Sequence, residues 1–328
     1  MRLVHVDRAG AALSEESGRL VVRADGERIA TLPLKTIDRI VVTAHAALAT
    51  ALLVRLLEQG TGVLVAPEAF RRFEPLHVVP ARADARRRLL QYAAAANPRA
   101  AARIAAGIVR LRLTGQAGVL RELAGDGRLP AARADEAVAA IATMAGRIGG
   151  RDETGQIRGA EGAGAAAFFG AFRAAFPAAL AFEARRRRPP PDPVNVCLSL
   201  GYTLAHHEAL HALSETGLDV ACGFLHEPLA GRDSLACDVT EPLRAIVERF
   251  VAGLFRADGL RPDHFSVKDG ACMMGKAGRR LFYERHAAEA APRLREVARS
   301  TAAWLLRELG ADAAAAHALG AGETPHGR

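Results

Sequence analysis

The sequence lacks the features that mark secreted, membrane-spanning or zinc-ribbon proteins. Its four cysteines include no Cys-x-x-Cys pair, so we expect no zinc ribbon and interpret them as buried thiols of a reducing compartment. No run of about 18 apolar residues is present that could span a bilayer. The first residues also lack the apolar core of a signal peptide. We therefore expect a cytoplasmic protein with no membrane partner.

Two nucleotide-binding patterns are also missing. The glycine-rich stretch Gly159–Gly164 lacks the Lys-Ser/Thr pair of a phosphate-binding P-loop, and no strand is predicted before it. No aromatic residues alternate with the basic runs, so the sequence does not indicate stacking of nucleic-acid bases on the protein.

The composition favours a protein with a polyanionic partner. Half of the 328 residues are hydrophobic and the net charge is +8. This length suits two domains, and the apolar content can supply a sizeable core. No basic amphipathic membrane anchor stands out, so nucleic acid is the expected class of partner.

Residues 1–80 are predicted to form a small, sandwich-like β-sheet domain. Asp25-Gly26 lies between two β-branched runs and is typical of a tight hairpin turn. Leucines at helical spacing predict one inserted helix over Ala47–Glu58, with Gly60 as its C-cap. The expected strands are Leu3–Val6, Arg19–Arg23, Arg28–Leu32, Arg39–Thr43, Val63–Ala66 and Leu76–Val79.

Residues 81–310 are predicted to form a larger all-α domain, which makes the fold class α+β. Ala81–Ala124 is rich in alanine, arginine and leucine and favours two helices separated near Asn97-Pro98. Residues 311–328 are expected to form a flexible tail. The other expected helices cover Asp135–Arg147, Ala160–Ala175, Val194–Glu215, Cys237–Leu254 and Ala291–Leu309.

A histidine and two acids suggest a metal site. His226 follows a short apolar run, and Asp238 and Glu241 lie three residues apart at the start of a predicted helix, on one face of it. An imidazole with carboxylates suits Mg²⁺ or Mn²⁺, ions that support phosphoryl chemistry. The alternative is a hydrogen-bonded core histidine with two acids that complement the helix dipole.

Glu161 is a further candidate. It lies among glycines and alanines in a largely apolar segment, so we expect its carboxylate to be half buried. A buried carboxylate must be paired, protonated or bound to a metal. The alternative is an ordinary surface glutamate near a helix N-terminus.

A second metal pattern competes with the first. His207-Glu208-Ala209-Leu210-His211 fits the His-Glu-x-x-His pattern of zinc peptidases. On a helix both histidines would share a face, and Glu208 would serve as general base. No downstream histidine supplies a third ligand; Glu215 or Glu227 could serve, although neither lies in a partner-helix motif. The alternative is chance occurrence in a core helix.

A basic run precedes several prolines. Arg185, Arg186, Arg187 and Arg188 lead into Pro-Pro-Pro-Asp-Pro, which holds the backbone extended. Arginine binds phosphate bidentately, so this run, together with Arg244, is a candidate DNA-binding surface. The alternative is a solvated loop.

Several ordered segments, taken together, resemble a known family. They are Arg186–Asn195, Leu198–Tyr202, Gly217–Asp219, Gly223–His226, Gly231-Arg232 and Ser234–Arg244, with an acidic motif around Glu161-Gly162 and Phe168-Phe169. This combination resembles the Cas1 family of CRISPR-associated endonucleases, and the β-then-α layout agrees with it over nearly the whole chain.

The resemblance implies a metal-dependent DNA endonuclease and integrase that inserts spacers into CRISPR arrays. It implies Mg²⁺ or Mn²⁺ bound by Glu161, His226 and Glu241, with Asp238 close to the metal as a further catalytic residue. It also implies a homodimer formed through the β domain, and a complex with Cas2 that holds prespacer DNA and acts on the CRISPR repeat.

Three positions depart from the family pattern without removing a ligand. Phe168 lies where a tyrosine is frequent, and Arg112 and Gly115 replace a lysine and an asparagine. The family has an ordinary core helix at His207–His211. The zinc peptidase and a non-catalytic DNA-binding scaffold remain the alternative functions.

Overall fold

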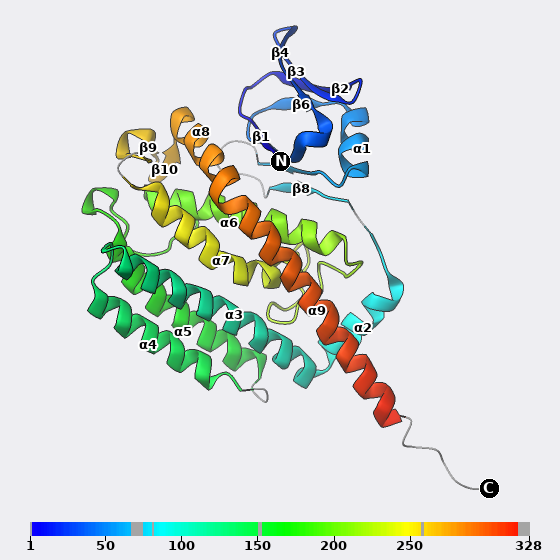
Figure 1. Cartoon of the computed structure of the whole chain (residues 1–328), viewed down its shortest axis with the longest axis vertical. Helices are drawn as coiled ribbons and strands as arrows, with labels where there is room; N and C mark the ends of the chain where they lie inside the picture. Colours follow the sequence, from blue (N-terminus) through cyan, green and yellow to red (C-terminus); the bar gives the residue numbers. More distant parts are fainter. Residues whose placement is uncertain (1, 67–74, 81, 150–152, 257–258, 321–328) are drawn as a thin grey trace, which may run out of the picture.

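A computed structural model describes residues 2–66, 75–80, 82–149, 153–256 and 259–320. A β-rich N-terminal region lies at one end of a larger helical region (Figure 1). The predicted α+β class, with the sheets first and the helices after them, is confirmed. No helix within these ranges is long and apolar enough to cross a membrane.

The N-terminal region contains two four-stranded sheets, with strand orders β1-β5-β7-β8 and β4-β3-β2-β6. Apolar side chains from both sheets and from the helix α1 share one core, including Leu13, Ile40 and Leu52, so the arrangement is sandwich-like. The elements are β1 (Arg2–Val6), β2 (Ala11–Glu16), β3 (Arg19–Ala24), β4 (Glu27–Pro33), β5 (Ile37–Val42), β6 (Ala46–Leu48), α1 (Thr50–Glu58), β7 (Gly62–Val65) and β8 (Leu76–Val78).

The turn chemistry of this region follows from its sequence. Asp25 and Gly26 join β3 to β4 and have φ angles of 54° and 82°, as a two-residue hairpin turn requires. The six predicted strands all form. The sequence prediction missed β2 and β6, because Ala11–Glu16 lacks a β-branched run and Ala46–Leu48 was assigned to the start of the helix.

The helical region begins where capping residues precede proline or a helix-forming run. Asn97 accepts hydrogen bonds from the backbone of Arg99 and Ala100, and Pro98 opens the helix, so the predicted break between two helices is confirmed. The helices are α2 (Ala85–Ala96), α3 (Pro98–Gly125), α4 (Ala131–Arg147), α5 (Thr154–Phe172), α6 (Pro193–Ser214), α7 (Ser234–Leu254), α8 (Lys276–Arg285) and α9 (Ala291–Gly320).

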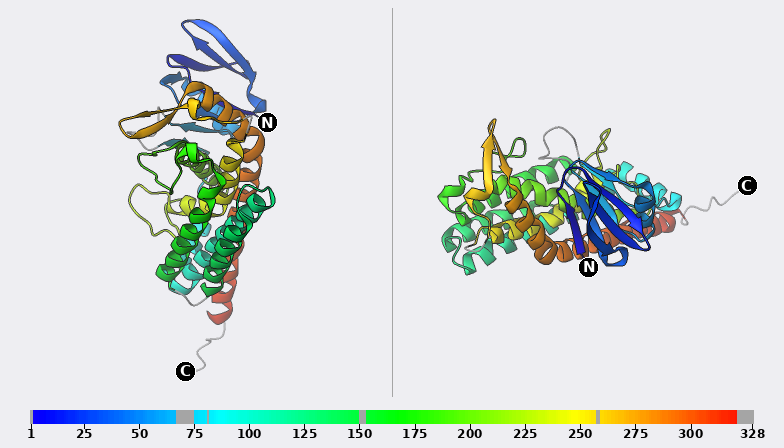
Figure 2. Two further views of the ribbon diagram at one scale, coloured as in Figure 1. Left: turned by 90° about the vertical axis from the view of Figure 1, so that its left-hand side faces the viewer. Right: turned by 90° about the horizontal axis from the view of Figure 1, so that it is seen from above.

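Two details of the helical region differ from the prediction. A hairpin of β9 (Phe265–Lys268) and β10 (Ala271–Met274) interrupts it and projects from the helices (Figure 2). The last helix continues to Gly320, past the expected end at Leu309, because its alanine-rich end has high helix propensity. The remainder of the predicted tail, residues 321–328, lies outside the described residues.

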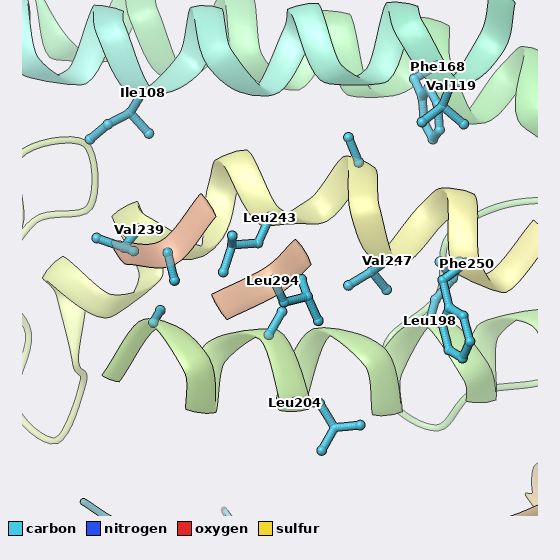
Figure 3. Close-up of a cluster of buried hydrophobic side chains, with 14 of the residues drawn as sticks. Ile108, Val119, Phe168, Leu198, Leu204, Val239, Leu243, Val247, Phe250 and Leu294 are labelled. Atoms are coloured by element: carbon cyan, nitrogen blue, oxygen red, sulfur yellow. The ribbon is translucent and has the colours of Figure 1, made fainter. Parts of the chain in front are cut away.

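Helix α7 lies between α3 and α6 in the core of the helical region (Figure 3). Its residues Val239, Leu243 and Val247 recur at four-residue spacing and are almost completely buried. This spacing places them on one side of α7, as the amphipathic sequence pattern requires. The central position of α7 brings its polar residues into the same buried environment.

Buried polar contacts join the β-rich and helical regions. Arg39 of β5 donates to the carboxylate of Glu208 on α6 at 2.8 Å, and both side chains are about 5% exposed. The Nε2 atom of His211 donates to the backbone oxygen of Gly60 at 2.6 Å. The Nδ1 atoms of His207 and His77 lie 3.2 Å apart.

These contacts engage all three residues of the His-Glu-x-x-His pattern. His207, Glu208 and His211 are 2%, 5% and 3% exposed. A peptide substrate could not reach them, and Glu208 is paired with an arginine. The zinc-peptidase interpretation is therefore wrong, and the segment serves the packing of the two regions.

We expect Glu208→Ala to lower the free energy of unfolding by about 3–5 kcal/mol, because it leaves the Arg39 charge buried without a carboxylate partner. Urea denaturation followed by circular dichroism measures this change. As a control, Glu58→Ala removes the exposed partner of Arg55 and should change stability by less than about 1 kcal/mol. Equal effects of the two substitutions would contradict the importance of the buried pair.

Candidate functional site

The three acids and one histidine identified in the sequence as candidate site residues come from three different elements. Glu161 lies on α5, Asp238 and Glu241 lie on α7, and His226 lies in the connection between α6 and α7. Helix α3 packs against both α5 and α7. Of these four side chains, Asp238 and Glu241 are buried, whereas His226 and Glu161 are 29% and 24% exposed.

Asp238 organises the histidine. Its Oδ1 atom accepts from the backbone nitrogen of His226 at 3.0 Å and lies 2.7 Å from the imidazole Nδ1. Its Oδ2 atom accepts from the backbone nitrogens of Phe224 and Leu225 at 2.6 and 3.1 Å. Because both oxygens are engaged and the side chain is fully buried, Asp238 orients His226 and does not itself face an incoming ion.

Glu241 faces His226 with one oxygen and two arginines with the other. Its Oε1 atom lies 4.0 Å from Nε2 of His226. Its Oε2 atom accepts from Nε of Arg244 at 2.8 Å and from Nη1 of Arg112 on α3. The same Nη1 atom donates to Glu161, so Arg112 joins the carboxylates of α5 and α7.

The close approach of α3 and α7 depends on a small residue at position 115. A Cβ atom placed on Gly115 would lie 2.8 Å from the Cβ of Ala245, nearer than two such atoms can approach. Gly115 lies one turn from Arg112, and Ala245 lies one turn from Glu241. The glycine therefore lets the two helices come close where the arginine meets the carboxylate.

The charges around Glu241 keep it ionised. Burial alone would raise the pKa of this carboxyl, but the guanidiniums of Arg244 and Arg112 outweigh burial and hold the pKa at about 2. Glu241 thus carries its negative charge at any physiological pH.

The residues have the donor chemistry that a hard divalent cation requires. An imidazole nitrogen and a carboxylate oxygen face each other at 4.0 Å, compared with about 3 Å between neighbouring ligands of an octahedral ion. Within the described residues, no three His, Cys, Asp or Glu side chains already surround one point. Arg112 donates to both Glu161 and Glu241, so its guanidinium stands where these two carboxylates approach each other.

The predicted DNA-binding arginines divide into two groups. Arg186, Arg187 and Arg188 are exposed. Arg185 instead donates to Asn195 and Ser199 at 2.9 and 3.0 Å, and burial lowers its pKa to about 10. Arg185 therefore braces the start of α6.

Arg244 is also turned inward. Its side chain is 15% exposed, and its guanidinium lies 4.7 Å from the ring centre of Tyr202 on α6 while its Nε atom bonds Glu241. We therefore assign Arg244 to the positioning of Glu241, which corrects its assignment to the DNA-binding surface.

Sequence reasoning missed the polar network behind the carboxylates. Tyr202 and Gln116 both donate to Oε1 of Glu248 on α7, at 2.8 and 3.0 Å. A signal was present: Glu241, Arg244 and Glu248 recur at helical spacing on the buried side of α7. Charged residues on an otherwise apolar face indicate partners from neighbouring helices.

Comparisons with known proteins identify the family of the chain. A family model described as CRISPR associated protein Cas1 matches residues 4–287. The chain belongs to the Cas1 family. It is 31% identical over 287 residues to CRISPR-associated endonuclease Cas1 1 of Thermodesulfovibrio yellowstonii, with 86% of this chain and 89% of the relative covered. It is 35% identical over 297 residues to a protein of the same name from Thermus thermophilus, with 86% of each covered.

Solved structures confirm the fold of this Cas1 family member. A Cas1 protein from Thermotoga maritima has a TM-score of 0.80 at 20% identity, with 94% of this chain and 97% of that one covered. A casposase bound to its integration product has a TM-score of 0.78 at 21% identity, with 92% and 91% covered. These likenesses extend over both the β-rich and the helical regions.

We expect Asp238→Asn to weaken Mn²⁺ binding by about 10–100-fold, because the amide cannot accept all four hydrogen bonds that orient His226. Electron paramagnetic resonance of free Mn²⁺ in a titration measures the affinity. Asp233→Asn is the matched control, since Asp233 is 44% exposed and lies just before α7. An unchanged affinity in Asp238→Asn would show that His226 needs no positioning by this carboxylate.

Proposed function

We propose that this Cas1 family member is a metal-dependent DNA endonuclease and integrase that inserts spacers into CRISPR arrays, with Glu161, His226 and Glu241 as its metal ligands. The observation that supports the proposal is the placement of His226 and Glu161 on either side of the Glu241 carboxylate contacts. His226 faces Glu241 across 4.0 Å, and Glu161 reaches the same carboxylate through Arg112. Family membership independently implies an endonuclease of the CRISPR system.

Mg²⁺ or Mn²⁺ bound by these residues would supply Lewis-acid stabilisation of charge at a phosphodiester. Oδ1 of Asp238 accepts a hydrogen bond from Nδ1–H of His226, which leaves the lone pair of Nε2 free to bind a metal ion. Glu241 remains ionised through Arg244 and Arg112. The attacking hydroxyl is water in cleavage and a DNA 3′-OH in integration, so the protein needs no nucleophile of its own.

The partially exposed side of the site is the expected entrance for DNA. His226 and Glu161 are partly exposed there, whereas Glu241 is buried. Arg158, one turn before Glu161, donates to Glu227 beside His226 at 2.7 Å and ties α5 to the histidine-bearing loop. The exposed Arg186–Arg188 run offers guanidiniums for the phosphate backbone.

The partners follow from the family and stay predictions. Solved neighbours in fold include a casposase with its integration product and a Cas6-RT-Cas1–Cas2 complex. We propose DNA, as prespacer and CRISPR repeat, and Cas2 as partners of this chain. We also propose a homodimer through the β-rich region, where the edge strand β4 carries the 45% exposed Ile29, and a cytoplasmic location.

We expect His226→Ala and Glu241→Gln to reduce DNA cleavage and strand transfer by at least about a hundredfold, because each substitution removes a metal ligand. Gel assays with labelled DNA and Mn²⁺ measure both reactions, and fluorescence anisotropy should show retained DNA binding. His264→Ala is the control, because His264 lies in the short 3-10 helix Pro262–His264 and is not one of the proposed ligands.

Wild-type cleavage by either variant would contradict the site assignment. If the wild-type protein itself binds DNA but neither cuts nor joins it in the presence of Mg²⁺ or Mn²⁺, the non-catalytic scaffold is the better explanation.

We expect Arg186→Ala combined with Arg187→Ala to weaken binding to DNA of any sequence and to reduce the slope of log affinity against log salt by about 2, because each contact neutralises one phosphate. Anisotropy at several salt concentrations measures the slope. Arg19→Ala, at an exposed position of β3, should leave it unchanged. A double variant with the wild-type slope would place the DNA path elsewhere.

A further inference from the structure

Arg112 occupies the place between the two acidic ligands. Its Nη1 atom donates to both Glu161 and Glu241, and the whole residue is only 5% exposed. The arginine is therefore a positive charge supplied by the chain at the point where carboxylates of α5 and α7 meet. Without such a charge, the two acids would repel each other in a poorly solvated environment.

The place between Glu161 and Glu241 can hold either the guanidinium of Arg112 or a divalent ion, but not both. The two negative charges of Glu161 and Glu241 are balanced by the two positive charges of Arg112 and Arg244. A divalent ion shared by the two carboxylates would meet the guanidinium of Arg112 at contact distance in a region of low dielectric. Like charges in such a region repel strongly, so the ion and Arg112 exclude each other from this place.

A second acceptor for Arg112 lies nearby. Gln116 follows Arg112 by one turn of α3 and donates to Oε1 of Glu248 at 3.0 Å. Oε2 of Glu248 is buried with no hydrogen-bond partner, and so is Nε of Arg112. Burial raises the pKa of Glu248, and the charge of Arg112 is the largest influence in the opposite direction.

We propose that Arg112 is a resident cation that holds Glu161 and Glu241 together until a divalent ion displaces it, and that it then turns toward Glu248. This inference rests on the proposed metal site. The new element is that Arg112 competes with the ion for the two carboxylates. As a result, the ligands stay assembled when no metal is bound, and they bind the ion less tightly than they would without the arginine. Arg112 acts as a positioning residue, because it neither binds the ion nor touches the substrate.

The test is isothermal titration calorimetry of the full chain with MnCl₂. If the Arg112 guanidinium lies between Glu161 and Glu241 in about nine molecules of ten, replacing Arg112 should tighten Mn²⁺ binding about tenfold. We expect this gain in Arg112→Met. We also expect Arg112→Met without metal to melt at a lower temperature than the wild type, and to gain more in melting temperature from saturating Mn²⁺.

Two further variants keep the proposal falsifiable if Arg112→Met folds poorly. Glu248→Gln removes the charge toward which Arg112 would turn, and should weaken Mn²⁺ binding. Arg112→Lys keeps the charge but loses the forked geometry, and should bind Mn²⁺ with an affinity between those of the wild type and Arg112→Met. Arg121→Met, an exposed position on the same helix, is the matched control and should bind Mn²⁺ as the wild type does.

The outcomes separate this inference from the function on which it rests. If His226→Ala abolishes Mn²⁺ binding but Arg112→Met binds no more tightly than the wild type, the metal site stands and the competition is wrong. If Mn²⁺ binding is unaffected by His226→Ala, the proposed metal site fails and this inference fails with it.

Discussion

The ionised carboxylate of Glu241, buried among helices, is the constraint on which the site depends. A charge at this position, 2% exposed, must be paired, because desolvation without a partner costs several kcal/mol. Arg112 and Arg244 provide the pairing. Arg112 comes from α3 and also binds Glu161 of α5, whereas Arg244 comes from α7 itself and lies against Tyr202 of α6. One carboxylate thereby fixes the relative positions of four helices.

The two acids of α7, Asp238 and Glu241, have different roles. Glu241 keeps one oxygen directed toward His226, whereas Asp238 uses both oxygens to hold the histidine and its backbone. A spacing of three residues put both acids on one helical face, but their depth and neighbours gave them different roles. The network continues through Gln116, Glu248 and Tyr202, which supports the ligands from behind.

Packing between the β-rich and helical regions explains why the His-Glu-x-x-His pattern was placed correctly on a helix but was wrongly interpreted as a zinc site. The prediction of a helix over His207–His211 was correct, and both histidines do face the same way. That face meets the β-rich region, where Arg39 and Gly60 engage Glu208 and His211. The pattern could not reveal this, because its meaning depends on a strand more than 150 residues earlier in the chain.

Local sequence rules are sufficient to predict the order and type of most elements, because caps, turn residues and apolar periodicity act over a few neighbouring residues. Asn97-Pro98 and Asp25-Gly26 are examples. The candidate residues Glu161, His226, Asp238 and Glu241 were also identifiable, with the help of the family's ordered motifs. The packing of the helices was needed to place Arg112 against Glu161 and Glu241, to give Asp238 its role in positioning His226, and to turn Arg244 inward. These assignments depend on how α3, α5 and α7 pack. The contact between Gly115 and Ala245, for example, brings together residues that are too far apart in the sequence for local rules to relate them.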